Sequence, residues 1–355
     1  MDIQTYIQDK KTLVSAHLTD FLKKDRIQKY SAINRWGNDA INRILPFTIN
    51  GKLLRSSLLF LATESFSEQN NHDITIKTAA AIELFQTGLL IHDDIMDQDE
   101  SRRGLDSMHI QYKKILNQGG AVHPEKLGES FAILTGDLSF SLAFQMLSTL
   151  QPPDLSQKLT ALIGSELGMV CVAQMQDVYG PHSQSPWTKD EILSVYTHKT
   201  ARYSIGLPLV AGGIIAGVDE LTIKKLWKMG TALGILYQIK DDWLNIFGDP
   251  QKTGKPVGSD IREGKQTLCY YFLMEKTKTQ GKEKLLQLFG NPKLSMKDMS
   301  DIQKQIIDLH IDSDIHDIVD KQEEIVDEII AHLLIAGDNR TLLNDFVEYL
   351  KKRDA

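Results

Sequence analysis

The sequence predicts an all-α protein that folds as a single-domain helical bundle. Apolar residues recur at the 3.6-residue spacing of helices along most of the 355 residues, while the two-residue alternation of strands is scarce. Hydrophobic residues make up 42% of the chain, which is ample for a large core. No linker, low-complexity tract or short repeat divides the sequence, so residues 1–355 are predicted to form one domain.

Composition and charge exclude several classes of protein. The net charge of −7 argues against a general nucleic-acid-binding surface and against an anionic-membrane surface. Two cysteines without metal or disulfide spacing indicate a reducing compartment, and we expect a cytoplasmic protein. The N-terminus lacks the apolar core of a signal peptide. The longest apolar run, 205–218, is short and interrupted by Pro208, so no transmembrane segment is expected.

The helices are expected in a definite order. Residues 1–48 are predicted to form two helices, which Pro46 and the Asn50-Gly51 pair end. The later expected elements are a helix start at 51–55, a helical run from 79, a polar Gly/Pro loop at 112–128, and helices at 129–137, 154–179, 204–217, 229–239 and within 266–352.

An acidic cluster follows the helical run that begins near residue 79. Asp93 and Asp97 are four residues apart, so they share a helix face, and Asp94 lies beside them. Like charges at this spacing repel, and Mg²⁺ is a suitable counter-ion because it prefers carboxylate oxygens and substrate phosphates. Arg102 and Arg103 follow, and guanidinium suits phosphate. Alone, this pattern is common and fits a solvated acidic helix end better than a metal-bridged diphosphate site.

A second acidic cluster changes that balance. Asp241 and Asp242 follow another apolar helical run, and Asn245 stands where a third aspartate would complete the pattern. Two such clusters on two long helices could face each other across a central cavity and hold a diphosphate through several metal ions.

Several further motifs, in order, resemble the trans-isoprenyl diphosphate synthases. They are GKLLR at 51–55, RRG at 102–104, QMQD at 174–177, HKTA at 198–201 and GKPVGSDIREGK at 254–265. The resemblance covers about Gly51 to Lys265. It implies an isoprenoid synthase type I-like bundle and a homodimer, with residues 1–48 packed outside the bundle or at the dimer interface.

The resemblance implies a site for isopentenyl diphosphate. Its residues would be Gly51, Lys52, Arg55, Gln86 and Arg103. The family segment reads GKRLRP, so Leu53 replaces one arginine here and Ser56 replaces the proline.

The resemblance also implies a site for the allylic diphosphate and its metals. Lys199 and Thr200 would hold this diphosphate, together with Arg102, Gln238 and Lys255 on a loop. Three Mg²⁺ ions would be held by carboxylates, namely Asp93, Asp97, Asp177, Asp241 and Asp242. The residues expected to take part in catalysis are Asp93, Asp94, Asp97, Arg102, Lys199 and Asp241.

Residues before the first cluster bear on product length. In the family, bulky aromatic residues four and five positions before the first aspartate stop the product at fifteen carbons, and here Leu89 and Gly88 occupy those positions. Gly88 therefore predicts a deeper pocket and a product of twenty carbons or slightly more, with Phe85 and Phe140 as candidates for the floor of the pocket. A helix-packing glycine explains Gly88 equally well.

The predicted activity is Mg²⁺-dependent head-to-tail condensation of isopentenyl diphosphate with an allylic diphosphate, giving geranylgeranyl diphosphate. A class I terpene cyclase would need an Asn/Asp, Ser/Thr, Glu metal triad, which DDWLNIFGD does not supply. A regulatory subunit of a two-component synthase usually loses residues of the acidic clusters, whereas this chain keeps nearly all of them. Condensation of two allylic chains is a third alternative, but it requires acidic clusters of another form.

Overall fold

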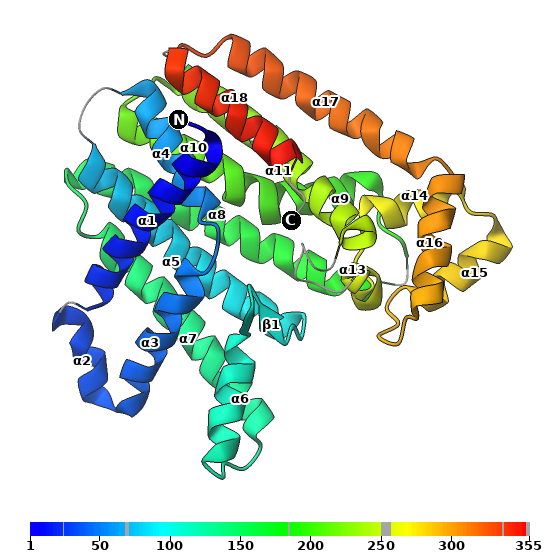
Figure 1. Cartoon of the computed structure of the whole chain (residues 1–355), viewed down its shortest axis with the longest axis horizontal. Coiled ribbons are helices and arrows are strands. Elements are labelled where there is room, and N and C mark those ends of the chain that lie inside the picture. Colours follow the sequence, from blue (N-terminus) through cyan, green and yellow to red (C-terminus); the bar gives the residue numbers. More distant parts are fainter. Residues whose placement is uncertain (24, 68–70, 184, 250–256, 336, 353–355) are drawn as a thin grey trace. The chain divides into compact units, whose positions relative to one another are not determined.

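The computed structural model describes residues 1–23, 25–67, 71–183, 185–249, 257–335 and 337–352. Nearly all of them are helical, and the two strands are a pair of two-residue segments, β1 (Ser101–Arg102) and β2 (Leu105–Asp106). The predicted all-α fold is confirmed (Figure 1). The chain's contacts define two compact units.

The first unit comprises Met1–Ile163 and Pro208–Val218. Its helices are α1 (Ile3–Leu22), α2 (Asp25–Ile33), α3 (Arg35–Ile49), α4 (Leu54–Phe66), α5 (His72–Met96), α6 (Met108–Gln118), α7 (Pro124–Leu147), the start of α8 (Pro153–Tyr179) and α10 (Leu207–Ala216). Helix α5 is the central element, since residues from Thr75 to Gly88 are almost all buried and α7 packs along it. The acidic cluster therefore lies at the end of a helix that the core holds firmly.

Three predictions for the first unit were wrong. Residues 1–48 lie in three helices rather than two, because Asn34 caps a separate helix α3 by accepting a hydrogen bond from the Trp36 backbone N–H. Pro46 lies inside α3, which continues to Ile49. Residues 112–118 and 124–128 of the predicted loop are helical. Helix α6 buries Met108, Tyr112 and Leu116 at four-residue spacing among polar neighbours, and α7 begins at Pro124.

The second unit comprises Gly164–Leu207 and Asp219–Ala355. Its elements are the end of α8, η1 (Gly180–His182), α9 (Lys189–Val195), η2 (Tyr196–Gly206), α11 (Glu220–Phe247), α13 (Ser259–Glu263), α14 (Leu268–Lys276), α15 (Thr279–Leu288), α16 (Met296–Asp308), α17 (Ile311–Ala331) and α18 (Gly337–Lys352). The predicted helices across 154–179 and 266–352 are thus present.

Element η2 is an unusual π-helix of 11 residues, and it carries the HKTA motif. It packs closely on α11, where a Cβ atom at Gly234 would lie 2.3 Å from the Cα atom of Ala201. Wide helical turns of this kind occur frequently at functional sites. The close approach fixes Lys199 and Thr200 relative to the helix that carries the second acidic cluster.

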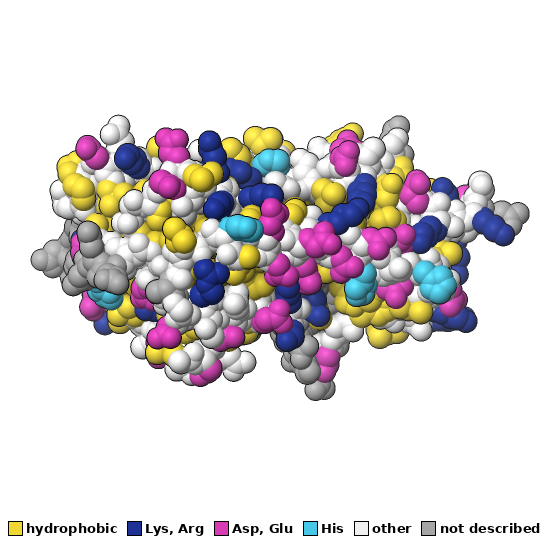
Figure 2. Space-filling view, turned by 90° about the horizontal axis from the view of Figure 1, so that it is seen from above, with side chains coloured by type: hydrophobic (Ala, Val, Ile, Leu, Met, Phe, Trp, Pro, Cys, Tyr) yellow, Lys and Arg dark blue, Asp and Glu magenta, His cyan; other side chains and the backbone are white. Residues whose placement is uncertain are grey.

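In the part of the chain that the structure describes, two helices are long and apolar enough to cross a membrane, namely α5 and α7. In α5, 78% of the most apolar window is buried inside the protein, as expected of a core helix, and the value for α7 is 44%. On the face shown in Figure 2, acidic and basic side chains are interspersed rather than gathered into one continuous basic patch.

Candidate active site

The first acidic cluster lies where α5 ends. The Asp97 backbone N–H donates to the Asp93 carbonyl at 2.9 Å, so the last helical turn continues to Asp97, as the spacing predicted. Asp94 is fully buried, whereas Asp93 and Asp97 are partly exposed.

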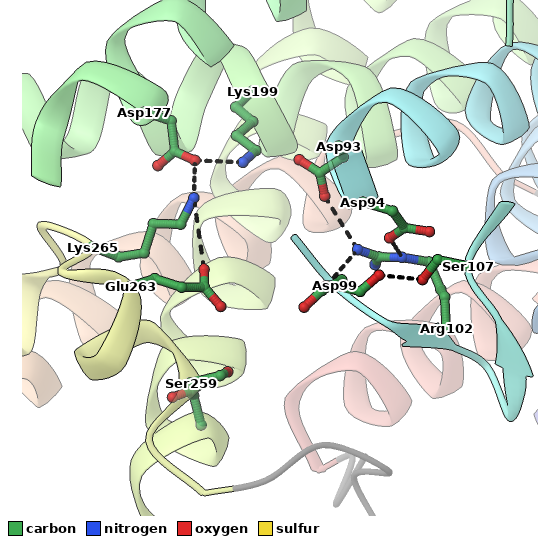
Figure 3. Close-up of polar contacts among 11 residues, drawn as sticks. Asp93, Asp94, Asp99, Arg102, Ser107, Asp177, Lys199, Ser259, Glu263 and Lys265 are labelled. Atoms are coloured by element: carbon green, nitrogen blue, oxygen red, sulfur yellow. Dashed lines mark hydrogen bonds and ion pairs between the residues drawn. The ribbon is translucent and has the colours of Figure 1, made fainter. Parts of the chain in front are cut away.

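Arg102 lies among the carboxylates of this cluster (Figure 3). Its Nη2 lies 3.3 Å from an Asp93 carboxylate oxygen and 3.0 Å from one of Asp99, and its Nε donates to Asp94 Oδ1. Burial raises the pKa of Asp94 to about 7 although Arg102 opposes this shift. The guanidinium thus partly neutralises a strongly acidic helix end.

The hairpin after the cluster joins it to the GKLLR segment. Arg103 and Gly104 form the turn between β1 and β2, both with positive φ (56° and 75°). The Asn50 side-chain amide donates to the Arg103 carbonyl at 2.6 Å. A Cβ atom at Gly51 would lie 2.4 Å from Arg103 Nη1, so the guanidinium rests directly on this glycine. The structure therefore brings together Gly51 and Arg103, two residues predicted for one substrate.

The start of α4 positions the other predicted residues of that substrate site. Lys52 is exposed and Arg55 is partly buried, with Leu53 between them in the left-handed region at φ 52°. Ser56 donates its backbone N–H and its hydroxyl to one oxygen of buried Glu83, at 3.1 and 2.8 Å. Neither bond is possible with proline at this position, since proline has neither group. Gln86 is buried one turn further along α5.

The space beside Gly88 is filled. A Cβ atom there would lie 2.4 Å from the Phe140 ring and 2.9 Å from the Gly136 carbonyl oxygen of α7. Of the two explanations, the structure favours a glycine that allows helices to pack. Phe85 is buried, with its ring centroid 6.1 Å from that of Phe140, and Leu89 is partly buried. Their effect on product length stays a prediction.

In the second unit, two lysines converge on Asp177 (Figure 3). The Nζ atoms of Lys199 and Lys265 lie 2.7 and 2.9 Å from the same oxygen, Asp177 Oδ2. Although burial works to raise it, the two ammonium groups hold the pKa of Asp177 below its usual value. The sequence predicts Asp177 as a metal ligand, and on the basic loop that ends at Lys265 it predicts Lys255 as the phosphate contact. The signal for Lys265 in the sequence is the Gly264-Lys265 pair, which ends the GKPVGSDIREGK motif.

A chain of hydrogen bonds crosses η2, α11 and α14. The Thr200 hydroxyl donates to Gln238, whose amide donates to Asp242 Oδ1, both at 2.8 Å. The Tyr196 hydroxyl donates to Asp242 Oδ2 and accepts from the Leu268 backbone N–H at 3.1 Å. Burial raises the pKa of Asp242 to about 7 against these two donors. Tyr196, which sequence reasoning missed, thus holds Asp242 in place.

The second cluster divides between two environments. Asp241 is exposed, whereas neighbouring Asp242 is buried with both oxygens hydrogen-bonded to protein. Asn245 contacts the start of α13 through its side chain. Lys255 lies outside the described residues.

The carboxylate oxygens of the two acidic clusters suit Mg²⁺. Carboxylate oxygens are the hard ligands that this ion prefers, and Asp94 Oδ2 is buried without a hydrogen-bond partner among the described residues. Within those same residues, no group of three or more acidic, His or Cys side chains is already gathered around one metal position. The carboxylates therefore fit the ion chemically, while Arg102 and two lysines neutralise part of their charge.

Comparison with known proteins agrees with this site. Residues 36–306 match the family model for polyprenyl synthetase. The chain is 34% identical over 278 residues to a short chain isoprenyl diphosphate synthase of Methanothermobacter thermautotrophicus, covering 75% of this chain and 80% of that protein. It is 32% identical to a geranylgeranyl diphosphate synthase of Sulfolobus acidocaldarius, over 71% of this chain and 72% of that protein.

A solved structure is similar over nearly the whole chain. The geranylgeranyl pyrophosphate synthase of Corynebacterium glutamicum, complexed with isoprenyl diphosphate and magnesium, has a TM-score of 0.88 and 27% identity, covering 99% of this chain and 100% of that one. The resemblance predicted from the motifs is confirmed: the chain belongs to the polyprenyl synthetase family and is a prenyltransferase.

Proposed function

We propose that the protein makes geranylgeranyl diphosphate by Mg²⁺-dependent head-to-tail condensation of isopentenyl diphosphate with an allylic diphosphate. The names of its relatives support this reaction, and the similar solved structure was determined with isoprenyl diphosphate and magnesium. The comparisons do not favour a cyclase or a regulatory subunit.

One observation in the second unit carries the proposal. Lys199 and Lys265 place two ammonium groups on one oxygen of Asp177. Glu263, with a carboxylate oxygen 3.9 Å from Lys265 Nζ, balances the second lysine, and Thr200 follows Lys199 on the same π-helix. Such a cluster suits a diphosphate, whose oxygens can accept from both lysines.

The reaction needs charge neutralisation on the leaving group. Arg102, Lys199 and Lys265 would stabilise the departing diphosphate as the carbon–oxygen bond breaks. When bound, Mg²⁺ would supply further neutralisation. Apolar core residues would keep water from the allylic cation, and Lys52, Arg55, Gln86 and Arg103 would orient isopentenyl diphosphate beside it. The departing diphosphate would take the proton, because these residues include no obvious general base.

The principal ligands that we propose for three Mg²⁺ ions are the carboxylates of Asp93, Asp97 and Asp241. Each is partly or fully exposed. Asp177 and Asp242 are already occupied by lysines or by Tyr196 and Gln238, so their contribution would be to hold these partners in place.

We also propose a cytoplasmic homodimer, without a membrane-spanning segment, built from one domain per chain. Apolar side chains on α7 and α8 are exposed, among them Leu134 (64%), Val172 (67%) and Met175 (70%). Such side chains favour burial against another surface. The mass in solution, measured by light scattering, would test the dimer, and a monomer at micromolar concentration would contradict it.

The activity is tested by product analysis. Purified protein would be incubated with Mg²⁺, isopentenyl diphosphate and each allylic primer, and products identified by mass spectrometry. A discrete twenty-carbon diphosphate is expected, and it should disappear with chelator. A product that stops at fifteen carbons would overturn the product assignment alone, whereas hydrocarbon release or no turnover in folded protein would overturn the reaction.

The site assignment is tested separately. Lys199→Gln and Lys265→Gln should each raise KM for the allylic diphosphate by about tenfold or more, because each removes a charge-assisted hydrogen bond. Lys284→Gln, a change at an exposed lysine, is the matched control. Equal KM values in all three variants would contradict a diphosphate site at this cluster.

A further inference from the structure

We propose that Asn245 is a positioning residue that holds Lys265 in the active site, and that it is not a metal ligand. The inference rests on the proposed function, which places Lys265 at the allylic diphosphate. Asn245 occupies the third position of the second acidic cluster, where the sequence pattern calls for an aspartate.

Both polar atoms of the Asn245 side chain are committed to the start of α13. Its Oδ1 accepts from the Asp260 backbone N–H at 3.2 Å, and its Nδ2 lies 2.6 Å from the Ser259 hydroxyl. Because a backbone N–H only donates, this contact fixes the amide orientation and makes Nδ2 the donor to Ser259. The Asn245 carbonyl also accepts from the Gly258 N–H at 2.7 Å.

The contact leads directly to the lysine. Helix α13 has only five residues, so its own hydrogen bonds hold it weakly and its position depends on outside contacts. The carbonyl of Asp260, the residue that Asn245 holds, accepts from the Lys265 backbone N–H at 2.8 Å. The Lys265 side chain then reaches Asp177 at 2.9 Å, beside Lys199. Asn245 therefore fixes the backbone from which Lys265 extends.

The same geometry predicts which substitutions preserve the function. Asn245→Asp keeps an oxygen that accepts from the Asp260 N–H. The Ser259 hydroxyl, which accepts from Asn245, can rotate and donate to the second carboxylate oxygen of the variant. Asn245→Ala loses both contacts. If Asn245 were a metal ligand, Asn245→Asp would lower the Mg²⁺ concentration needed for half-maximal rate, because a carboxylate binds Mg²⁺ more strongly than an amide does.

The experiment measures kinetics, metal dependence and backbone protection in these variants. Asn245→Ala should raise KM for the allylic diphosphate by about tenfold, as expected for two lost hydrogen bonds, and leave KM for isopentenyl diphosphate within about twofold. The Mg²⁺ concentration for half-maximal rate should not change. Asn245→Asp should remain near wild type, and Asn117→Ala, at an exposed asparagine of α6, is the control.

Two further readouts locate the effect. In hydrogen exchange, the amides of Gly258, Asp260 and Lys265 should lose protection in Asn245→Ala and keep it in Asn245→Asp. In a double-mutant cycle, Asn245→Ala should add little once Lys265 is changed to Gln, since it acts through that residue. A change in the Mg²⁺ requirement, or full additivity with Lys265→Gln, would overturn the positioning role.

The outcomes separate this inference from the proposed function. If Lys265→Gln leaves the allylic KM unchanged, the diphosphate site itself is wrong. If Lys265→Gln raises that KM and Asn245→Ala does not, the site stands and the role of Asn245 is refuted.

Discussion

At the scale of single residues, Gly51 has no side chain because the Arg103 guanidinium packs directly against it. A Cβ atom at this position would lie 2.4 Å from Arg103 Nη1, too close for the guanidinium to stay where it is. Gly51→Ala would displace the end of a flexible side chain and leave the backbone in place, so the melting temperature should change little. KM for isopentenyl diphosphate should rise by about tenfold, because a small displacement of a substrate-binding group is costly.

The control for this change is Gly337→Ala, at a glycine where a Cβ atom meets no atom within 4 Å. An unchanged KM in Gly51→Ala would show that Arg103 does not bind this substrate. A large drop in melting temperature would show instead that the glycine serves the fold.

Ser56 provides a second residue-scale prediction. Its hydroxyl and backbone N–H both donate to buried Glu83, and Ser56→Pro would remove both bonds. We expect the free energy of unfolding to fall by about 1–3 kcal/mol, since a buried acceptor loses its donors. Ser56→Ala should cost less because it keeps the N–H. Urea unfolding measures both, with Ser141→Ala on the exposed face of α7 as the control.

At the scale of elements, the contact between α5 and α7 depends on Gly88. A methyl group there would meet both the Phe140 ring and the Gly136 backbone oxygen, and the backbone cannot yield easily. Gly88→Ala should therefore lower the free energy of unfolding by about 1–3 kcal/mol. Adding Phe140→Leu should recover part of the loss, and chemical denaturation of the single and double variants measures it. Equal stability of Gly88→Ala and wild type would refute the packing explanation.

Element type was predictable where periodicity is strong and unpredictable where it is weak. The apolar run from Ala79 reveals α5, because its buried stretch is almost uninterrupted. The sequence predicts a loop over most of α6, because the three buried apolar residues of this helix lie among polar ones. The π-helix η2 has no periodic signature of its own, since its geometry depends on the close contact between Ala201 and Gly234.

At the scale of the whole molecule, the sequence was sufficient for the fold class, the family and the acidic clusters. These depend on local patterns and on the order of motifs. Contacts between distant segments were not predictable in the same way. Lys265 reaches Asp177 across 88 positions, and Tyr196 reaches Asp242 across 46. Only the folded chain shows that the two lysines share one carboxylate.

The stability of the whole chain should depend on pH through His109. This histidine is 7% exposed, its Nδ1 has no hydrogen-bond partner among the described residues, and burial lowers its pKa. As the pH falls below about 6.5, the unfolded chain binds a proton that the folded chain resists, so stability is lost from there down to the folded pKa. Above this window the contribution is complete.

The difference in melting temperature between wild type and His109→Gln isolates this effect from other titrating groups. The wild type should lose stability relative to the variant between pH 7.5 and 5.5, while His316→Gln, at an exposed histidine, should show no such divergence. A constant difference across this range would mean that His109 accepts its proton as readily in the folded chain as in the unfolded one. The buried face of α6 would then be open to water, contrary to the packing of Met108 and Tyr112 against the core.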